Sequence, residues 1–202
     1  METVDLGLPS GTLWAEMNVG AEKISDIGGY VAFGNASIHD EAEINEYTLF
    51  ASDCHDNGLV KNNMICKYTP GDSLMVMQPE DDMARITLGK SFSTPTIEDF
   101  KELVDNTTQA VGTFNNEKCL KLKSKVNDAE LYFPCTGWAS DGTVKCKDDG
   151  GVYMTANMTD NFMALWVFTF DVDNAQTQLL DCARRYVGLT IRAICKNSNT
   201  ES

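Results

Sequence analysis

TVDLGLPSGTLWAEMNVG, residues 3–20, alternates apolar with small or polar residues on both sides of one turn signal, Pro9-Ser10-Gly11. Alternation over a few residues is typical of a strand with one buried face. A turn rich in proline and glycine between two such runs is typical of paired strands. The stretch therefore predicts a pair of short strands near the N-terminus, and the fold must contain a sheet.

The segment that follows carries weaker signals. Residues 28–34 (GGYVAFG) form a short apolar run between glycines and predict another strand. Residues 35–78 are polar, hold scattered turn residues and show weak periodicity, so we expect a long irregular region. Long loops in a compact domain are usually functional or packed as surface insertions.

Two helix signals lie in the middle of the chain. Residues 79–86 join Pro-Glu-Asp-Asp to Met-Ala-Arg-Ile, and this predicts a short helix with acidic residues at its start and Gly89 at its end. Residues 94–104 give the clearer signal, because Thr96 suits the N-cap and Asp99 stands three residues later, in the capping-box position. Four apolar side chains share one face of this helix: Ile97, Phe100, Leu103 and Val104.

The second half of the chain has β character. Residues 119–125 and 129–133 alternate around the turn Asn127-Asp128 and predict a hairpin. Further strands are predicted at 151–155, 164–170 and 188–195. Strands, then two helices, then more strands without βαβ repetition predict an α+β fold. We expect one domain over residues 1–196 and a frayed tail over residues 197–202.

Net charge excludes several classes of partner. Thirty Asp and Glu against 16 Lys and Arg give a formal charge of −14, which would repel nucleic acids and anionic membrane surfaces. The longest strongly apolar stretch, Met163 to Phe170, is too short for a membrane-spanning helix, so we expect no membrane insertion. The first twenty residues lack a basic segment followed by an apolar run, so no signal peptide is visible. Either the protein is not exported by that route or a leader has been removed.

Residues that could support catalysis are sparse. The two histidines, His39 and His55, lie in the irregular region, the second within Asp53-Cys54-His55-Asp56. Adjacent residues rarely converge on one point, so we interpret this run as a solvated loop rather than a nucleophilic or metal site. We expect neither a catalytic residue nor a cofactor. Seven cysteines occur without a C-x-x-C motif, and we interpret them as reduced and partly buried, with a disulfide framework as the alternative.

Three acidic groups could in principle ligate calcium: Glu80-Asp81-Asp82, Asp141 near Asp148-Asp149, and Asp171 with Asp173. The first is better explained as favourable charge at a helix start. No EF-hand spacing is present, so we predict no metal site, and a structural calcium at the other two groups stays the alternative.

Three motifs together resemble one known family. The opening, residues 4–15 (VDLGLPSGTLWA) with Asn18-Val19-Gly20-Ala21 and Gly28-Gly29-Tyr30, resembles the start of the Fibrobacter succinogenes major paralogous domain. Residues 79–104 resemble its middle, although Ser93-Thr94 replace the usual arginine-methionine pair. Residues 188–192 (GLTIR) resemble its closing Gly-Phe-Ser-Val-Arg motif. The resemblance covers nearly the whole chain.

The resemblance implies a C-type-lectin-like fold of the formylglycine-generating-enzyme type, with two helices packed on short antiparallel sheets. It also implies similarity to the variable proteins of diversity-generating retroelements. The implied function is non-enzymatic display of a ligand-binding face, as in a phage or viral receptor-binding protein or a surface adhesin. The ligand would be a protein or glycan on a host or neighbouring cell, and the location a virion or cell surface. The alternatives are a bacterial cell-surface domain with fixed specificity and a relative of the formylglycine-generating enzymes.

In such proteins mutagenesis acts on adenines of Asn codons, and its products exclude Met, Trp, Gln, Lys and Glu. Every residue from 179 to 187 (LLDCARRYV) belongs to the reachable set. The apolar run at its start predicts a contact surface on an exposed connection, or else an ordinary buried strand or helical turn. Scaffold roles are expected for Met154, Met163, Trp166, Gln176, Gln178, Arg185, Gly188 and Arg192. The predicted ligand-binding face comprises Asp160, Asn161, Phe162, Leu165, Phe168, Asp173, Asn174, Leu180, Asp181, Cys182, Arg184 and Tyr186.

Overall fold

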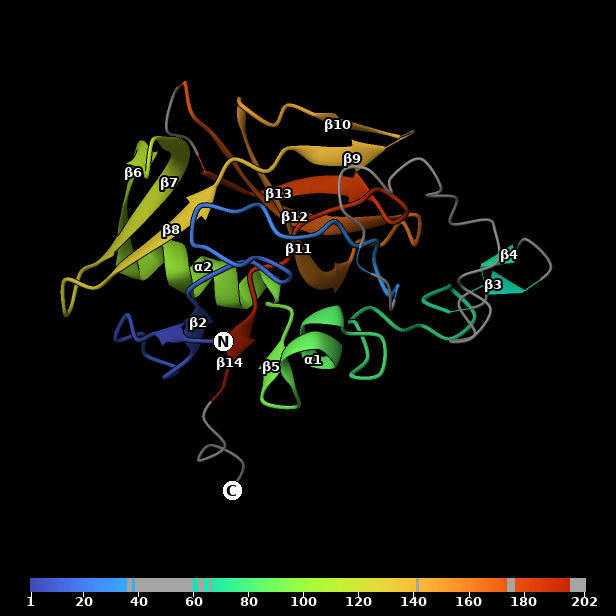
Figure 1. The fold of residues 1–202 in the computed structure, drawn as a ribbon. Helices are drawn as coiled ribbons and strands as arrows, with labels where there is room; N and C mark the ends of the chain where they lie inside the picture. Colours follow the sequence, from blue (N-terminus) through green and yellow to red (C-terminus); the bar gives the residue numbers. More distant parts are fainter. Residues whose placement is uncertain are drawn as a thin grey trace.

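The computed structural model describes residues 1–35, 38, 60–61, 64–65, 67–140, 142–173 and 177–196 (Figure 1). Residues 60–61, 64–65 and 178–181 are described by their backbone alone. In chain order the elements are β1 (Thr3–Val4), β2 (Leu13–Ala15), β3 (Val60–Lys61), β4 (Met64–Ile65), α1 (Met83–Leu88), β5 (Phe92–Ser93), α2 (Ile97–Asn106), β6 (Thr107–Phe114), β7 (Glu117–Ser124), β8 (Glu130–Pro134), β9 (Trp138–Ser140), β10 (Thr143–Lys145), β11 (Gly150–Met158), β12 (Ala164–Asp171), β13 (Thr177–Arg184) and β14 (Ile194–Cys195). Small antiparallel sheets with two helices confirm the α+β prediction. The predicted tail, 197–202, lies outside the described residues.

The two ends of the chain meet in one sheet, of strand order β1-β2-β14-β5 (Figure 1). The predicted N-terminal strand pair is confirmed, with Thr3 opposite Ala15 and Val4 opposite Trp14. Gly11 has a φ of +71°, which an L-residue adopts only at a cost, and its N–H closes the turn on the Leu8 carbonyl at 2.8 Å. Because β14 pairs with β2, residues about 180 positions apart in the chain share one small sheet.

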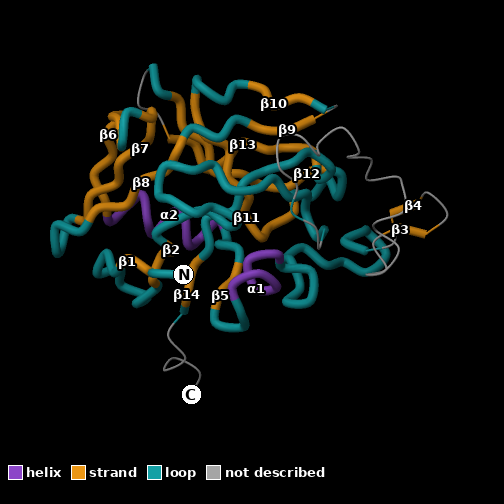
Figure 2. Tube along the Cα trace, viewed as in Figure 1, coloured by secondary structure: helices purple, strands orange, loops and turns teal. Residues whose placement is uncertain are grey.

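Both predicted helices are confirmed, and their ends follow from local capping. Asp82 is the N-cap of α1, where its carboxylate accepts from the Ala84 N–H at 3.0 Å. The same carboxylate also accepts from the backbone N–H and the hydroxyl of Thr94, which directly follows β5, so it fixes the end of β5 as well. Thr96 and Asp99 form the capping box of α2. Figure 2 shows these two helices set among strands and long loop paths.

The β-rich half consists mainly of two three-stranded sheets, β6-β7-β8 and β11-β12-β13. The predicted hairpin is confirmed as β7 and β8. The sequence did not predict β6, because its polar residues and Gly112 interrupt the alternation of apolar and polar side chains. No loop residue separates β6 from α2 to mark where the strand begins. The predicted strands at 151–155 and 164–170 are confirmed as parts of β11 and β12.

Two strand predictions were wrong in extent. Residues 188–190 do not form a continuous strand with β14, because each bridges to a different partner: Gly188 to Ala139, Leu189 to Val31, and Thr190 to Tyr153. The run at 28–34 is reduced to the bridge at Val31 and its flanking residues. The predicted irregular region, 35–78, lies largely outside the described residues.

The core of the described residues has two main clusters, one on each face of the β11-β12-β13 sheet. One cluster packs α2 against β12, where the rings of Phe100 and Phe168 stack with centroids 4.6 Å apart. Trp14 and Phe133 complete this aromatic cluster. The other cluster contains Met154 and Val167 and reaches α1 and the C-terminal segment. β12 is therefore covered on both faces.

A fully buried arginine connects the chain ends to this core. The Arg192 guanidinium donates to the Asn18 side-chain oxygen at 2.7 Å and to the Glu16 and Tyr132 carbonyls at 2.6 and 2.8 Å. It also lies over the Phe133 ring, 4.7 Å from the centroid. Burial lowers the pKa of Arg192 to about 10, so the side chain stays charged at neutral pH. The predicted structural role of this residue is confirmed.

We expect Arg192→Met to destabilise the protein by about 3 kcal/mol or more, because it leaves several buried acceptors without a donor. The free energy of unfolding from urea titration measures this loss. Arg184→Met is the matched control, since Arg184 is exposed, and its effect should stay within about 0.5 kcal/mol. Equal losses in the two variants would contradict the assigned role.

Candidate functional site

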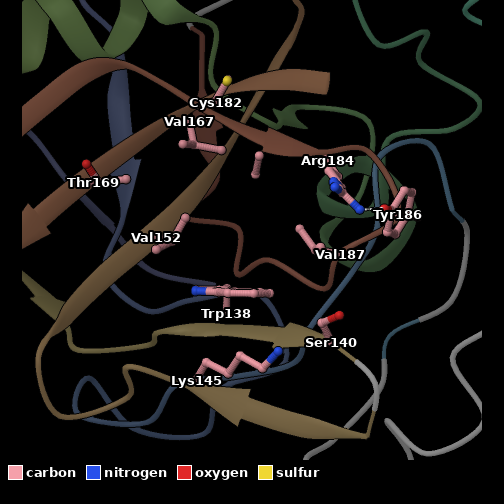
Figure 3. Close-up of a pocket in the computed structure, with 11 residues that line it drawn as sticks. Trp138, Ser140, Lys145, Val152, Val167, Thr169, Cys182, Arg184, Tyr186 and Val187 are labelled. Carbon is pink, nitrogen blue, oxygen red and sulfur yellow. Dashed lines mark hydrogen bonds between the residues drawn. The ribbon is translucent and has the colours of Figure 1, made fainter. Parts of the chain in front are cut away.

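A cavity of about 540 Å³ lies between the β9-β10 hairpin and the β11-β12-β13 sheet (Figure 3). Its walls come from five strands and the turn after β13. The lining residues are Trp138, Ser140, Lys145, Val152, Val167, Thr169, Cys182, Ala183, Arg184, Tyr186 and Val187. A concave site of this size, with mixed apolar and polar walls, is typical of small-molecule recognition.

Glycines and one bridge fix the hairpin against the sheet. Gly137, just before β9, has a φ of +54°, and its N–H donates to the Gly150 carbonyl at 3.1 Å. A Cβ on Gly137 would lie 2.0 Å from the Lys145 carbonyl oxygen, so no other residue fits there without a backbone shift. Ala139 and Gly188 exchange two hydrogen bonds of 2.9 Å. The hairpin wall therefore depends on the C-terminal segment.

Two cation–aromatic pairs line the cavity. Lys145 is the cross-strand partner of Trp138, and its ammonium lies 4.8 Å from the indole centroid. Figure 3 shows Lys145 on one side of the indole and Val152, Arg184 and Tyr186 on the other. The Arg184 guanidinium lies 5.7 Å from the Tyr186 ring centroid and donates to the Tyr186 hydroxyl. Each pair holds a cation beside a flat ring at the cavity wall.

Part of the predicted binding face lines this cavity. Cys182 and Arg184 are exposed and Tyr186 is half-buried, and all three lie at or just after the end of β13. The segment up to Arg184 is thus a strand rather than a connection. The alternative of a buried strand is confirmed only in its secondary structure, because Cys182 and Arg184 are exposed. The side chains of Leu180 and Asp181 and the whole of Asn174 lie outside the described residues.

Other predicted residues lie elsewhere. Asp160, Asn161 and Phe162 line a separate, smaller cavity of about 300 Å³, together with Tyr68, Thr69, Pro70, Met163 and Arg185. Asp173 is exposed just beyond β12, and its N–H donates to the Asp171 carboxylate at 2.7 Å. The predicted face therefore divides into at least two surfaces.

The prediction that Leu165 and Phe168 contact a ligand was wrong. Leu165 and Phe168 have no exposed surface, although both lie in β12 within the predicted face. Alternation exposes one side of a strand only when one face of the sheet meets water. Since the α2 cluster covers one face of β12 and the second cluster the other, both side chains are core residues.

The predicted binding face does not include the hairpin residues Trp138 and Lys145. A local signal was available, because Asp141-Gly142 separates two short alternating runs and this dipeptide favours a hairpin. The signal predicts the hairpin, but its place over the sheet depends on the distant bridge to Gly188.

The acidic groups and histidines give no site in the described part of the chain. Among these residues no group of three or more His, Cys, Asp or Glu side chains could hold a metal ion. His39, His55 and Asp141 lie outside the described residues. None of the described helices is long and apolar enough to cross a membrane.

The five described cysteines differ in exposure. Cys119 and Cys135 are buried, as predicted, and burial raises the pKa of Cys135 to about 11. Cys146 and Cys182 are exposed, so the prediction of burial was wrong for them. Cys54 and Cys66 lie outside the described residues.

No family model matches this chain, and comparison with curated proteins and with solved structures gives no match.

We expect Gly137→Ala to lower the free energy of unfolding by about 2 kcal/mol or more, since the added methyl meets backbone and φ is positive. Urea titration measures the change. Gly112→Ala is the matched control, because the space around Gly112 is open and its φ is not positive, and it should be near neutral. A tolerated Gly137→Ala would mean that the hairpin is not held at this point.

Iodoacetamide at about pH 8 should alkylate Cys146 and Cys182 quickly and spare Cys119 and Cys135 in the folded protein. At that pH a thiol with a pKa of about 11 is ionised in roughly one molecule in a thousand, and burial limits access further. Peptide mass spectrometry locates the adducts. Urea supplies the control, because unfolding should make all of these thiols react. Rapid labelling of native Cys135 would contradict the described burial.

Proposed function

We propose that this protein is a non-enzymatic ligand-binding display domain with a C-type-lectin-like fold of the formylglycine-generating-enzyme type. The cavity between the β9-β10 hairpin and β13 is its ligand site. The observation that carries the proposal is the composition of this cavity, in which Trp138, Arg184 and Tyr186 combine flat rings with polar groups. Aromatic residues and arginine are the types enriched where proteins recognise ligands.

The arrangement of the motifs supports the proposed fold. Residues from the opening and closing motifs of the resemblance contact each other, since Asn18 accepts from Arg192 and the Val19 N–H donates to the Ile191 carbonyl. Motifs at opposite ends of the chain thus serve one structural purpose. This is expected if the resemblance reflects a shared architecture.

The two buried thiols, Cys119 and Cys135, do not suit nucleophilic catalysis. A nucleophilic cysteine needs a lowered pKa and access to substrate. Burial instead raises the pKa of Cys119 and Cys135. Neither of these residues suits a relative of the thiol-dependent enzymes with this proposed fold.

Within this proposal the protein is a variable protein of a diversity-generating retroelement, located on a virion or cell surface. Adenine mutagenesis of Asn codons would reach Cys182, Arg184 and Tyr186 but never produce Trp138 or Lys145. The cavity then has a variable wall from β13 and a constant wall from the β9-β10 hairpin. Such a division suits a site that changes ligands while keeping its shape.

Deep sequencing of the gene across a natural population tests this version. We expect a several-fold excess of substitutions at Cys182, Arg184 and Tyr186 over Trp138 and Lys145. The buried residue Met154 supplies the background rate. A uniform rate over all these positions would reject diversification and leave a fixed-specificity surface domain as the function.

A further inference from the structure

The charged side chains among the residues that line the cavity are both cations. Lys145 comes from β10 and Arg184 from β13, and Figure 3 shows them on two sides of the cavity. Among the described lining residues there is no aspartate or glutamate. The whole chain, in contrast, has a formal net charge of −14. The described walls of the cavity are thus positively charged on a protein that is acidic as a whole.

The cations of the cavity also differ from those elsewhere on the molecule. Many lysines of the described surface form ion pairs with carboxylates: Lys67, Lys101, Lys121, Lys123 and Lys196. Lys145 and Arg184 form no such pair with any described residue, and each lies beside an aromatic ring instead. A ring orients a cation without cancelling its charge, so both charges stay available to a ligand. Walls of low dielectric strengthen their field inside the cavity.

The remaining walls suit a sugar. Ser140, Thr169 and Tyr186 carry hydroxyl groups, and Val152 and the indole of Trp138 supply apolar surface. A carbohydrate presents the same combination, with hydroxyl groups around the ring and an apolar face of C–H groups. A volume of about 540 Å³ is suited to a small ligand such as a short carbohydrate, whereas a protein partner generally needs a much larger surface.

We infer that the cavity binds an acidic carbohydrate, whose carboxylate or sulfate pairs with Lys145 and Arg184 and whose ring packs on Trp138. This inference rests on the proposed function and specifies its ligand class.

The test uses the full chain and four probes in ligand-observed NMR titrations. Sialyllactose carries a carboxylate, sulfated lactose carries a sulfate, lactose is the neutral core of both, and a short glutamate peptide is the acidic non-sugar. We expect one or both acidic sugars to bind at least about tenfold more tightly than lactose or the peptide, the gain expected from charge-assisted hydrogen bonds. Comparison of the two acidic sugars identifies which anion is preferred. Sodium chloride at about 0.5 M should weaken their binding, because salt screens exposed charges.

Variants locate the binding site. Arg184→Gln and Lys145→Gln should each weaken binding of the acidic sugar about tenfold, and Trp138→Ala should weaken both the acidic sugar and lactose. Lys90→Gln is the matched control, because it removes one exposed positive charge near α1, remote from the cavity, and should change nothing. Unchanged urea midpoints for all four variants show that loss of binding is not loss of folding.

The outcomes separate this inference from the proposed function. Tight binding of the glutamate peptide through the same two cations overturns the carbohydrate assignment but keeps the cavity as a site. Equal binding of lactose and sialyllactose, lost in Trp138→Ala alone, overturns the acidic preference and keeps the display function. Failure of both acidic sugars to bind overturns the inference, whereas diversification is judged separately by the sequencing.

Discussion

The buried guanidinium of Arg192 is the interaction on which the rest of the structure depends. A positive charge without solvent requires many acceptors, and here they are the Asn18 side chain and backbone carbonyls from two distant segments. The same Asn18 donates to the Tyr153 hydroxyl, which in turn donates to the Pro134 carbonyl. If the C-terminal segment that carries Arg192 leaves, all of these acceptors lose their donor, so this segment couples the N-terminal strands to β8 and β11.

That assembly determines the shape of the cavity. The residues just before Arg192 run between the hairpin and the central sheet, with Gly188 bridged to Ala139 and Thr190 bridged to Tyr153. A Cβ on Gly188 would lie 3.0 Å from the side chains of Tyr30 and Ala139, so the close approach depends on glycine. The hairpin wall and the sheet wall are thus spaced by a segment that the arginine anchors. The side chains that line the cavity therefore depend for their positions on contacts of Arg192 that lie outside the cavity.

The sequence predicts elements whose cause is local and fails where the cause is distant. Both helices follow from caps within a few residues, such as Thr96 with Asp99, and these predictions are confirmed. The strand predicted at 188–195 was wrong because its residues change partners one by one, which no periodicity records. The predictions of site residues succeed and fail for the same reasons. The lining role of Arg184 follows from family resemblance and local exposure, whereas the burial of Phe168 depends on α2, which lies more than sixty residues earlier.

Two adjacent arginines, Arg184 and Arg185, have different roles, one at the cavity and one in the scaffold. Arg184 is exposed and points its guanidinium to Tyr186 at the cavity, while Arg185 is 3% exposed. The Arg185 guanidinium donates to the carbonyls of Tyr68, Phe162 and Lys67 at 2.8–3.2 Å and so holds the loops beside β13. Arg184 is the last residue of β13 and Arg185 begins the turn after it, so the two guanidinium groups have different surroundings. One residue can therefore change its ligand contacts while the next stays fixed, and any substitution at Arg185 would act on the scaffold rather than on recognition.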